Sequence, residues 1–132
     1  MARAPEPEVV YLDTHVVCWL YEGRSELLSA AARNAVERGQ LLVSPVVDLE
    51  LQLLREIGRI LKGPEIVLPA LSREIGLHVA AMDYARVVVA ARDLAWTRDP
   101  FDRLITADAM LAGARLVTKD RLIRKHCPAA VW

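Results

Sequence analysis

Short apolar runs alternate along the chain with longer stretches of helical period. The four apolar runs, each of a length typical of a buried strand, are residues 9–12, 41–44, 77–80 and 115–118. The stretches predicted as helices are residues 14–21, 26–38, 46–61, 69–75, 84–93, 101–112 and 121–125. Strands that alternate with helices are typical of βαβ units. We therefore predict an α/β fold, a mostly parallel sheet of four to five short strands with helices on both faces.

Capping residues support several of these helix boundaries. Ser25 stands at the N-cap of the helix predicted at 26–38, and Gly39 follows its last residue. Ser44 and Pro45, a cap followed by a proline at the first helical position, precede the next helix. These signals predict where helices begin and end independently of the apolar pattern.

Two aspartates follow predicted strands directly. Asp13 comes after the first strand, and Asp120 comes shortly after the last. In open parallel sheets, ligands bind in the crevice beyond the carboxyl ends of the strands. Asp13 and Asp120 are therefore the first candidates for the chemistry of this protein.

Glu50 is the clearest local anomaly of the helix predicted at 46–61. At 100° per residue it shares its face with six apolar residues, which are Val46, Val47, Leu53, Leu54, Ile57 and Leu61. An unpaired buried carboxylate costs several kcal/mol, so a glutamate on this face requires a nearby cation. The pattern leaves open whether that cation is an arginine or a metal ion.

Three more aspartates belong to the helix predicted at 101–112. Asp102 lies in its first turn, on the same face as the small residues Thr106 and Ala109, which would let another element approach closely. Asp99 precedes a proline and is by default an N-cap. Asp108 lies about 120° from Asp102 around the axis and is interpreted as a surface or supporting residue.

Asp13, Glu50, Asp102 and Asp120 come from four separate elements near one edge of the predicted sheet. If they cluster, like charges about 4 Å apart repel by about 4 kcal/mol at an effective dielectric constant of 20, so the cluster needs a divalent metal or protonation. Carboxylate oxygens suit Mg²⁺ or Mn²⁺. A metal held in this way can activate water for phosphodiester hydrolysis.

Composition and charge narrow the class of protein. With 132 residues, 54% hydrophobic and 26% charged, the chain has the size and composition of one globular domain, which we place at residues 9–132 after an N-terminal arm at 1–8. The longest aliphatic stretch, residues 87–91, is too short for a membrane span, and residues 1–8 lack an apolar signal core. We expect a cytoplasmic protein with no membrane contact, whose two cysteines are free thiols.

The net charge of zero hides an imbalance between the two parts of the chain. Residues 1–97 hold 10 basic and 13 acidic side chains, whereas residues 98–132 hold 7 basic and 4 acidic ones. Clustered Lys and Arg bind phosphates even where the whole protein is neutral. The candidates for a phosphate-binding rim are Arg98, Arg103, Lys119 and Arg121, and a solvated surface remains the alternative interpretation.

Four segments, in order, resemble those of PIN-domain ribonucleases, especially the VapC-type toxins of type II toxin–antitoxin pairs. Residues 10–15 (VYLDTH) resemble the opening strand with its first catalytic aspartate, and residues 43–51 (VSPVVDLEL) resemble the second strand and the helix that carries a glutamate. Residues 98–105 (RDPFDRLI) are similar to the segment with the third acid, and residues 116–122 (LVTKDRL) to the closing segment with the fourth. The resemblance covers nearly the whole chain.

The resemblance implies a role for each matching residue. It implies Asp13, Glu50, Asp102 and Asp120 as catalytic ligands of Mg²⁺ or Mn²⁺, with Asp99 as an auxiliary ligand. Thr14 and Thr118 would be supporting polar residues. It also implies an RNA substrate, homodimerisation and inhibition by a cognate antitoxin that occludes the acidic site.

Other functions of aspartate-bearing α/β proteins were compared with the residues of this chain. A haloacid-dehalogenase-like phosphatase requires a second aspartate two residues after the first, where this chain has His15. A response-regulator receiver requires adjacent acids near the end of the first strand, and only Lys119 fits part of that pattern. The remaining alternative is a catalytically inactive PIN-like module that binds RNA or a protein. The histidines are interpreted as structural or exposed, and the tryptophans as packing residues rather than base-stacking ones.

Overall fold

A computed structural model of the protein describes residues 6–132. Five parallel strands form one sheet in the order β3-β2-β1-β4-β5. The strands are β1 (Val9–Leu12), β2 (Gln40–Val43), β3 (His78–Val79), β4 (Arg115–Val117) and β5 (Ala130–Val131). The predicted α/β class is confirmed, and the four apolar runs correspond to β1 to β4. No strand was predicted at β5, which has only two residues, as does β3.

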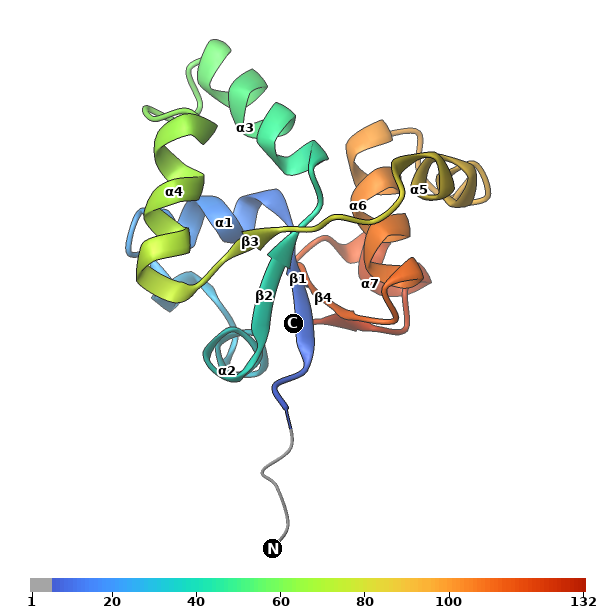
Figure 1. The fold of residues 1–132 in the computed structure, drawn as a ribbon, viewed down its shortest axis with the longest axis horizontal. Helices are drawn as coiled ribbons and strands as arrows, with labels where there is room; N and C mark the ends of the chain where they lie inside the picture. Colours follow the sequence, from blue (N-terminus) through green and yellow to red (C-terminus); the bar gives the residue numbers. More distant parts are fainter. Residues whose placement is uncertain (1–5) are drawn as a thin grey trace, which may run out of the picture.

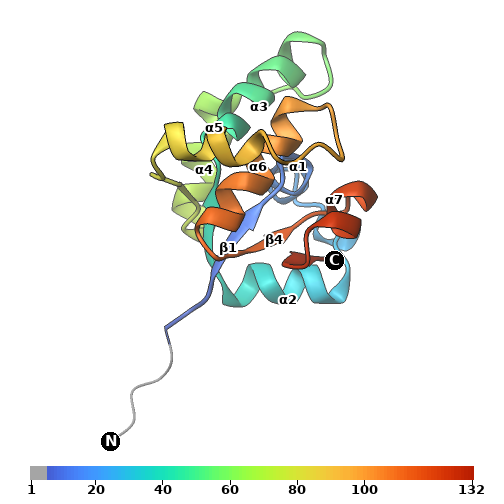
Figure 2. The ribbon, with the colours of Figure 1, turned by 90° about the vertical axis from the view of Figure 1, so that its right-hand side faces the viewer.

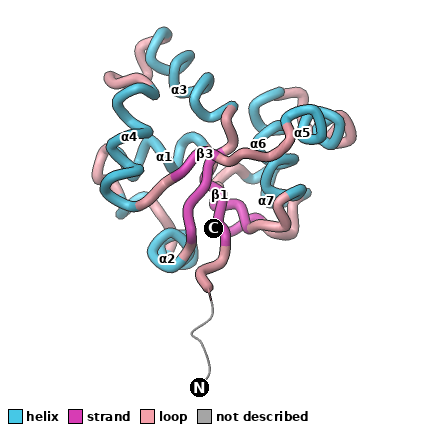
Figure 3. Tube along the Cα trace, in the orientation of Figure 1, coloured by secondary structure: helices cyan, strands magenta, loops and turns pink. Residues whose placement is uncertain are grey.

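Helices cover both faces of the sheet. The α-helices are α1 (Thr14–Tyr21), α2 (Ala30–Arg38), α3 (Val46–Glu56), α4 (Pro64–Ile75), α5 (Tyr84–Ala91), α6 (Pro100–Leu111) and α7 (Arg121–His126). Figure 1 shows α1, α2 and α4 on one side of the sheet and α5, α6 and α7 on the other. Figure 2 looks onto the side with α5 to α7, and Figure 3 shows the strands gathered between the two groups of helices. Among the described residues, none of these helices is long and apolar enough to cross a bilayer.

The core lies where the central strands meet the helices. Its most buried large side chains, each less than 2% exposed, are Val10, Tyr11, Leu12, Val16, Val17, Val43, Val47, Leu51, Leu71, Ile105, Leu116 and Ile123. Both faces of β1 are buried, which explains its continuous apolar sequence. Gly39 packs closely against this strand, because a Cβ at that position would lie 2.6 Å from the Cγ2 atom of Val10.

The helix predicted at 26–38 is wrong in its first part. Residues Ser25–Leu27 form a short 3₁₀ turn, and α2 begins only at Ala30, with the Ser29 hydroxyl accepting a hydrogen bond from Ala32 N at 3.1 Å. Leu28 between them is extended and 3% exposed. The chain therefore leaves helical geometry in order to bury Leu28.

The helix predicted at 46–61 is also too long. It ends at Glu56, and Gly58 follows with φ at +78°, a left-handed conformation that terminates helices. As a result, Ile57 and Leu61 are 68% and 90% exposed instead of buried on the apolar face. The next helix begins earlier than predicted, at Pro64 rather than Pro69, because burial of Val67, Ala70 and Leu71 holds it together across the internal proline.

Of the predicted N-terminal arm, residues 1–5 lie outside the described residues. Glu6, Pro7 and Glu8 are exposed. Glu8 contacts the domain through two interactions, because its carbonyl oxygen accepts a hydrogen bond from Gln40 N at 2.7 Å and its carboxylate lies 3.5 Å from Arg115. The chain is therefore tied to the edge of β2 one residue before β1 begins.

The order of the strands positions the candidate site. The chain moves from β1 outward to β2 and β3, returns to β4 on the other side of β1, and ends at β5. The carboxyl ends of β1 and β4 thus lie side by side at the point where the topology reverses, the usual location of a functional crevice. A hydrogen bond from Asp13 N to Val117 O, at 3.0 Å, continues their pairing into this crevice.

Candidate active site

One cleft, with a volume of about 480 Å³, is lined by all four acids that the sequence singled out. Asp13 follows β1, Glu50 lies on α3, Asp102 lies in the first turn of α6, and Asp120 follows β4. We call this space, defined by Asp13, Glu50, Asp102 and Asp120, the acidic cleft. Residues up to 107 positions apart in sequence meet there because four elements end or begin at the same edge of the sheet.

Asp13 is held by hydrogen bonds from both of its neighbouring segments. Its Oδ1 atom accepts from Thr14 N at 2.8 Å and thereby caps α1, and its Oδ2 atom accepts from the hydroxyl of Thr118 at 2.6 Å. The same hydroxyl accepts from Asp120 N at 3.0 Å. Thr118 therefore links the two aspartates, and it is fully buried beneath the cleft.

Glu50 is half-buried and accepts a short hydrogen bond from the hydroxyl of Thr14. Burial raises the pKa of Glu50, the Thr14 hydrogen bond lowers it, and the negative charges of Asp13 and Asp99 raise it further. Its hydrogen-bond partner among the described side chains is thus a hydroxyl rather than an arginine. Of the two cations that the sequence left open for Glu50, the metal ion fits the cleft better.

Asp102 has the most perturbed carboxyl of the cleft. Burial raises its pKa to about 7, with further increases from the negative charges of Asp99, Asp13, Asp120 and Glu50. Each of these carboxylates disfavours ionisation of Asp102. The cleft therefore concentrates more negative charge than it neutralises by itself.

Helix N-termini offset part of this charge. Asp120 caps α7, where its Oδ1 atom accepts from Leu122 N and Ile123 N, each at 2.9 Å. Asp99 caps α6 in the same way, accepting from Phe101 N at 2.8 Å and Asp102 N at 3.2 Å. Aligned peptide dipoles favour anions at these positions. The predicted cap function of Asp99 is confirmed, and its carboxyl is not among the groups that line the cleft.

The four basic candidates differ in their surroundings. Arg103 donates hydrogen bonds to the carbonyl oxygens of Thr97 and Arg92, at 2.8 and 3.5 Å, so its guanidinium is engaged in the fold. Arg98 and Arg121 are exposed and do not line the cleft. The ammonium of Lys119 lies 5.9 Å from the ring centroid of Trp19, a residue that does line it.

Sequence reasoning missed other residues that line the cleft. Arg24 and Arg59 contribute cations from the loops after α1 and α3. His15 and Trp19 contribute aromatic rings from α1. The interpretation of His15 as structural and of Trp19 as a packing residue agrees with the hydrogen bond from Lys119 N to His15 and with the contact of Trp19 with the core, but it left out their place in the cleft. Their spacing of four residues on a helix that begins at Thr14 was the available signal, since such residues share one helix face.

Of the two interpretations of Asp108, as a surface or as a supporting residue, the structure confirms the second. Asp108 is 1% exposed, and its Oδ1 atom accepts a hydrogen bond from the hydroxyl of Tyr11 at 2.7 Å. Burial and this carboxylate raise the pKa of Tyr11. The contact joins β1 to α6, the two elements that position Asp13 and Asp102, so Asp108 acts as a supporting residue inside the core.

The donor set of the acidic cleft fits a divalent metal ion by its chemistry. All four donors are carboxylates, which hard cations such as Mg²⁺ and Mn²⁺ prefer, and burial and the neighbouring carboxylates raise the pKa of Asp102. Within residues 6–132, no three Asp, Glu, His or Cys side chains already form a preassembled metal site.

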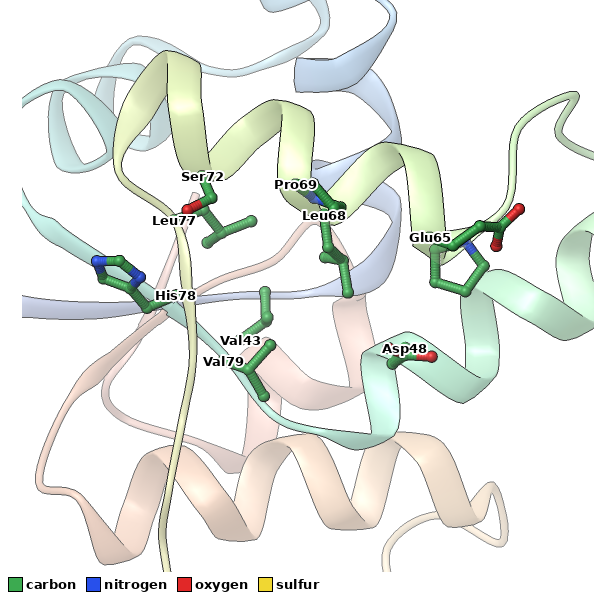
Figure 4. A pocket seen from close by; sticks show the side chains of 10 residues that line it. Val43, Asp48, Glu65, Leu68, Pro69, Ser72, Leu77, His78 and Val79 are labelled. Atoms are coloured by element: carbon green, nitrogen blue, oxygen red, sulfur yellow. The ribbon is translucent and has the colours of Figure 1, made fainter.

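A second pocket lies between β2, β3, α3 and α4 and has a volume of about 330 Å³ (Figure 4). Its polar side chains, Asp48, Glu65, Ser72 and His78, stand among apolar ones such as Val43 and Leu77. None of the four candidate acids lines it. It lacks the concentration of carboxylates that makes the acidic cleft the candidate site.

Comparisons with known proteins agree with this architecture. The PIN domain family model matches residues 10–127. Ribonuclease VapC22 of Mycobacterium tuberculosis (strain ATCC 25618 / H37Rv) is 37% identical, in an alignment that covers 93% of this chain and 98% of that protein. Among solved structures, VapBC2 from Rickettsia felis bound to a DNA fragment from its promoter matches with a TM-score of 0.57 and 20% identity, over 92% of this chain and 95% of that one. At this identity the structural match shows a shared fold.

Proposed function

This chain belongs to the PIN-domain family, and on that premise we propose that it is a metal-dependent endoribonuclease, the toxin of a type II toxin–antitoxin pair. The observation that carries the proposal is the acidic cleft, where Asp13, Glu50, Asp102 and Asp120 from four elements face one space. The substrate is RNA, the reaction is hydrolysis of a phosphodiester bond, and the site of action is the cytoplasm. The relative named a ribonuclease, 37% identical over nearly its full length, supports the reaction class.

The four carboxylates would hold Mg²⁺ or Mn²⁺. When bound, such an ion lowers the pKa of water and neutralises charge that develops on the phosphate. Thr118 and Thr14 orient Asp13 and Glu50 through their hydroxyl groups, so that the carboxylate oxygens face the cleft with little freedom. Each hydroxyl limits the orientations that its carboxylate can take, which reduces the entropy lost when a ligand binds.

Ionisable side chains and helix N-termini determine the charge of the acidic cleft. With a pKa of about 7, Asp102 holds a proton below neutral pH and has to release it before it can act as a metal ligand. The N-termini of α1, α6 and α7 favour the anionic forms of the residues beside them. The basic side chains Arg24 and Arg59 line the same cleft and can attract the phosphates of the substrate.

A cognate antitoxin is the proposed protein partner, and it would occlude the acidic cleft. Support comes from apolar side chains that remain exposed beside the cleft, Leu53, Ile57 and Leu61, at 39%, 68% and 90%. Isolated exposed apolar residues are common, but this run follows one helix into its loop, next to the cleft residues Leu54, Arg59 and Ile60. A partner that covers it would block access of RNA.

We also propose that the protein is a homodimer. Tyr84, Val88 and Val89 on α5 are between 40% and 55% exposed, and Met110 on the adjacent α6 is 53% exposed. Helices α5 and α6, which carry these side chains, lie on the side of the sheet opposite α1 and α4 (Figure 1). Light scattering of the purified protein should give the mass of two chains, and replacing Val89 by Glu should give the mass of one.

Cleavage of a mixed tRNA and mRNA pool by antitoxin-free protein tests the proposed function. With Mg²⁺ or Mn²⁺ we expect discrete fragments from the wild-type protein, and we expect none with EDTA or with Asp13→Asn. Asp48→Asn is the matched control, because Asp48 is exposed on α3 and does not line the acidic cleft. A folded protein that binds RNA but leaves it intact under all these conditions would instead be an inactive PIN-like binding module.

A further inference from the structure

Two aromatic side chains that line the acidic cleft, His15 and Trp19, have an aromatic and a cationic neighbour, Trp132 and Lys119. We call His15, Trp19, Lys119 and Trp132 the aromatic rim. The ring centroids of His15 and Trp19 are 5.0 Å apart with an interplanar angle of 64°, and those of Trp19 and Trp132 are 6.0 Å apart. The ammonium of Lys119 lies 5.9 Å from the centroid of Trp19. His15 and Trp19 line the same cleft as the four acids.

Backbone interactions place this rim at a defined position relative to the acids. The Nε2 atom of His15 accepts a hydrogen bond from Lys119 N at 3.0 Å, and its Nδ1 atom lies 3.4 Å from Oδ2 of Asp13. Lys119 directly precedes Asp120. The ends of β1 and β4, which hold Asp13 and Asp120, therefore also orient the ring of His15 and, through it, the indole of Trp19.

Trp19 and Trp132 both pack partly against the core, but Trp19 also lines the acidic cleft. The other ring pair of this kind, Trp96 and His126, is stacked at 5.2 Å and 6° and does not line the cleft. At the aromatic rim, by contrast, the rings of His15 and Trp19 line the cleft, and the exposed side chain of Lys119 places its ammonium over the ring of Trp19. Aromatic side chains beside Lys or Arg are the combination that binds single-stranded RNA, with rings for the bases and cations for the phosphates.

We propose that the aromatic rim binds one nucleobase of the RNA next to the phosphate that is cleaved, with Trp19 as the stacking residue and Lys119 contacting the adjoining phosphate. This inference rests on the proposed function and adds a substrate-positioning role for residues outside the four acids. The long side chain of Lys119 can exchange the indole face for a phosphate when a base stacks there. Stacking is tolerant of base identity, so the rim would orient RNA more than it would select a sequence.

A protein with Trp19 as its sole tryptophan tests the contact directly. Trp96→Phe and Trp132→Phe remove the other two indoles, and Asp13→Asn prevents turnover while asparagine still caps α1. With Mg²⁺ present, we expect a short single-stranded RNA to quench the Trp19 fluorescence in a saturable manner. An abasic oligonucleotide of the same length and charge should quench much less. Equal quenching by both probes, or none by either, would overturn the proposal.

Substitutions of Trp19 give a second, independent readout. Trp19→Phe keeps a stacking ring, whereas Trp19→Leu keeps apolar volume without one. We expect the leucine variant to raise KM for RNA about tenfold with little change in kcat, and the phenylalanine variant to stay within about threefold of wild type. Trp96→Leu is the matched control and should leave both constants unchanged. Equal effects of phenylalanine and leucine at position 19 would contradict stacking.

The two experiments separate this inference from the proposed function. A wild-type protein that cleaves RNA with Mg²⁺, together with a single-tryptophan protein that shows no base-dependent quenching, contradicts the aromatic rim alone. Base-dependent quenching in a protein that never cleaves RNA supports the rim and contradicts the nuclease. Melting temperatures of all variants, measured by circular dichroism, establish that each one is folded at the assay temperature.

Discussion

Replacement of Asp102 by asparagine should stabilise the metal-free protein. The carboxyl of Asp102 has an ordinary pKa of 3.8 and reaches about 7 in the folded chain, because burial and four neighbouring carboxylates disfavour its charge. That difference corresponds to at most about 4 kcal/mol of free energy of unfolding. Solvent reaches about half of this group, so screening reduces the expected gain to about 1–2 kcal/mol. Asparagine has nearly the same shape and carries no charge.

The gain from Asp102→Asn should depend on pH in a defined direction. In the folded protein Asp102 keeps its proton up to about pH 7, whereas in the unfolded chain it loses the proton near pH 4. The folded state therefore binds more protons between these values, and the wild-type stability contributed by this group is present at low pH and lost as pH rises through 7. The advantage of the variant should thus begin near pH 4, reach about a third of its full size at pH 5 and be fully developed at pH 8.

Urea denaturation in EDTA at pH 5, 6.5 and 8 measures this effect. Asp48→Asn is the matched control, because Asp48 also lies in the first turn of a helix, α3, but is exposed. The control should lose a few tenths of a kcal/mol at every pH, since only its interaction with the helix dipole disappears. If Asp102→Asn is less stable than wild type at pH 8, or if its effect is the same at pH 5 and pH 8, the electrostatic description of the cleft is wrong.

Three further predictions concern the metal, the core contact and the orientation of Asp13. Added Mg²⁺ should raise the melting temperature of the wild type more at pH 8 than at pH 6, because the proton on Asp102 competes with the ion. EDTA should reverse this rise in melting temperature. An equal rise at both pH values would contradict the competition between proton and ion. Tyr11→Phe should lower the free energy of unfolding by about 1–3 kcal/mol in urea titrations, because buried Asp108 loses its hydrogen-bond donor; an unchanged midpoint would show that another group satisfies it. Thr118→Val should reduce the rate of RNA cleavage about tenfold at low Mn²⁺, because Asp13 loses the hydroxyl that orients it, and the far-UV circular dichroism spectrum should not change. A rate of cleavage equal to that of the wild type would show that the Thr118 hydroxyl has no role in catalysis.

The sequence predicted the elements that depend on local signals. Residues 9–12 and 14–21 were placed at their observed bounds, because a run of apolar residues followed by Asp13 marks both the end of a strand and the cap of a helix. The sheet and its parallel order followed from the alternation of strands and helices. The last strand, β5, was not predicted, although its two residues lie in the apolar stretch at residues 129–132.

Helix lengths depend on tertiary packing, and the predicted bounds of two helices, 26–38 and 46–61, were therefore wrong. Helical period continues from residue 46 to 61, but Gly58 adopts a left-handed conformation and the chain turns. Likewise, Leu28 leaves helical geometry because it packs into the core. In both cases the local helix propensity is compatible with a longer helix. The helix boundary is decided by the free energy of packing against residues that are far away in sequence.

The candidate site was predictable in its acids and much less so in their surroundings. The sequence alone indicates the aspartates that follow strands and the glutamate on an apolar helix face. The burial of Asp108 depends on the Tyr11 hydroxyl 97 positions away, and the place of Trp19 depends on the Lys119 backbone that orients His15. No local pattern encodes such contacts.

The rate of RNA cleavage as a function of Mn²⁺ concentration tests the central claim most directly. We predict a saturable increase for the wild type, the same curve for Asp48→Asn, and no cleavage for Asp13→Asn or Asp102→Asn at any concentration of the ion. The two inactive variants should have melting temperatures in EDTA at least as high as that of the wild type. Cleavage that persists in EDTA, or wild-type rates in Asp13→Asn and Asp102→Asn, would contradict a metal-dependent ribonuclease built on the acidic cleft.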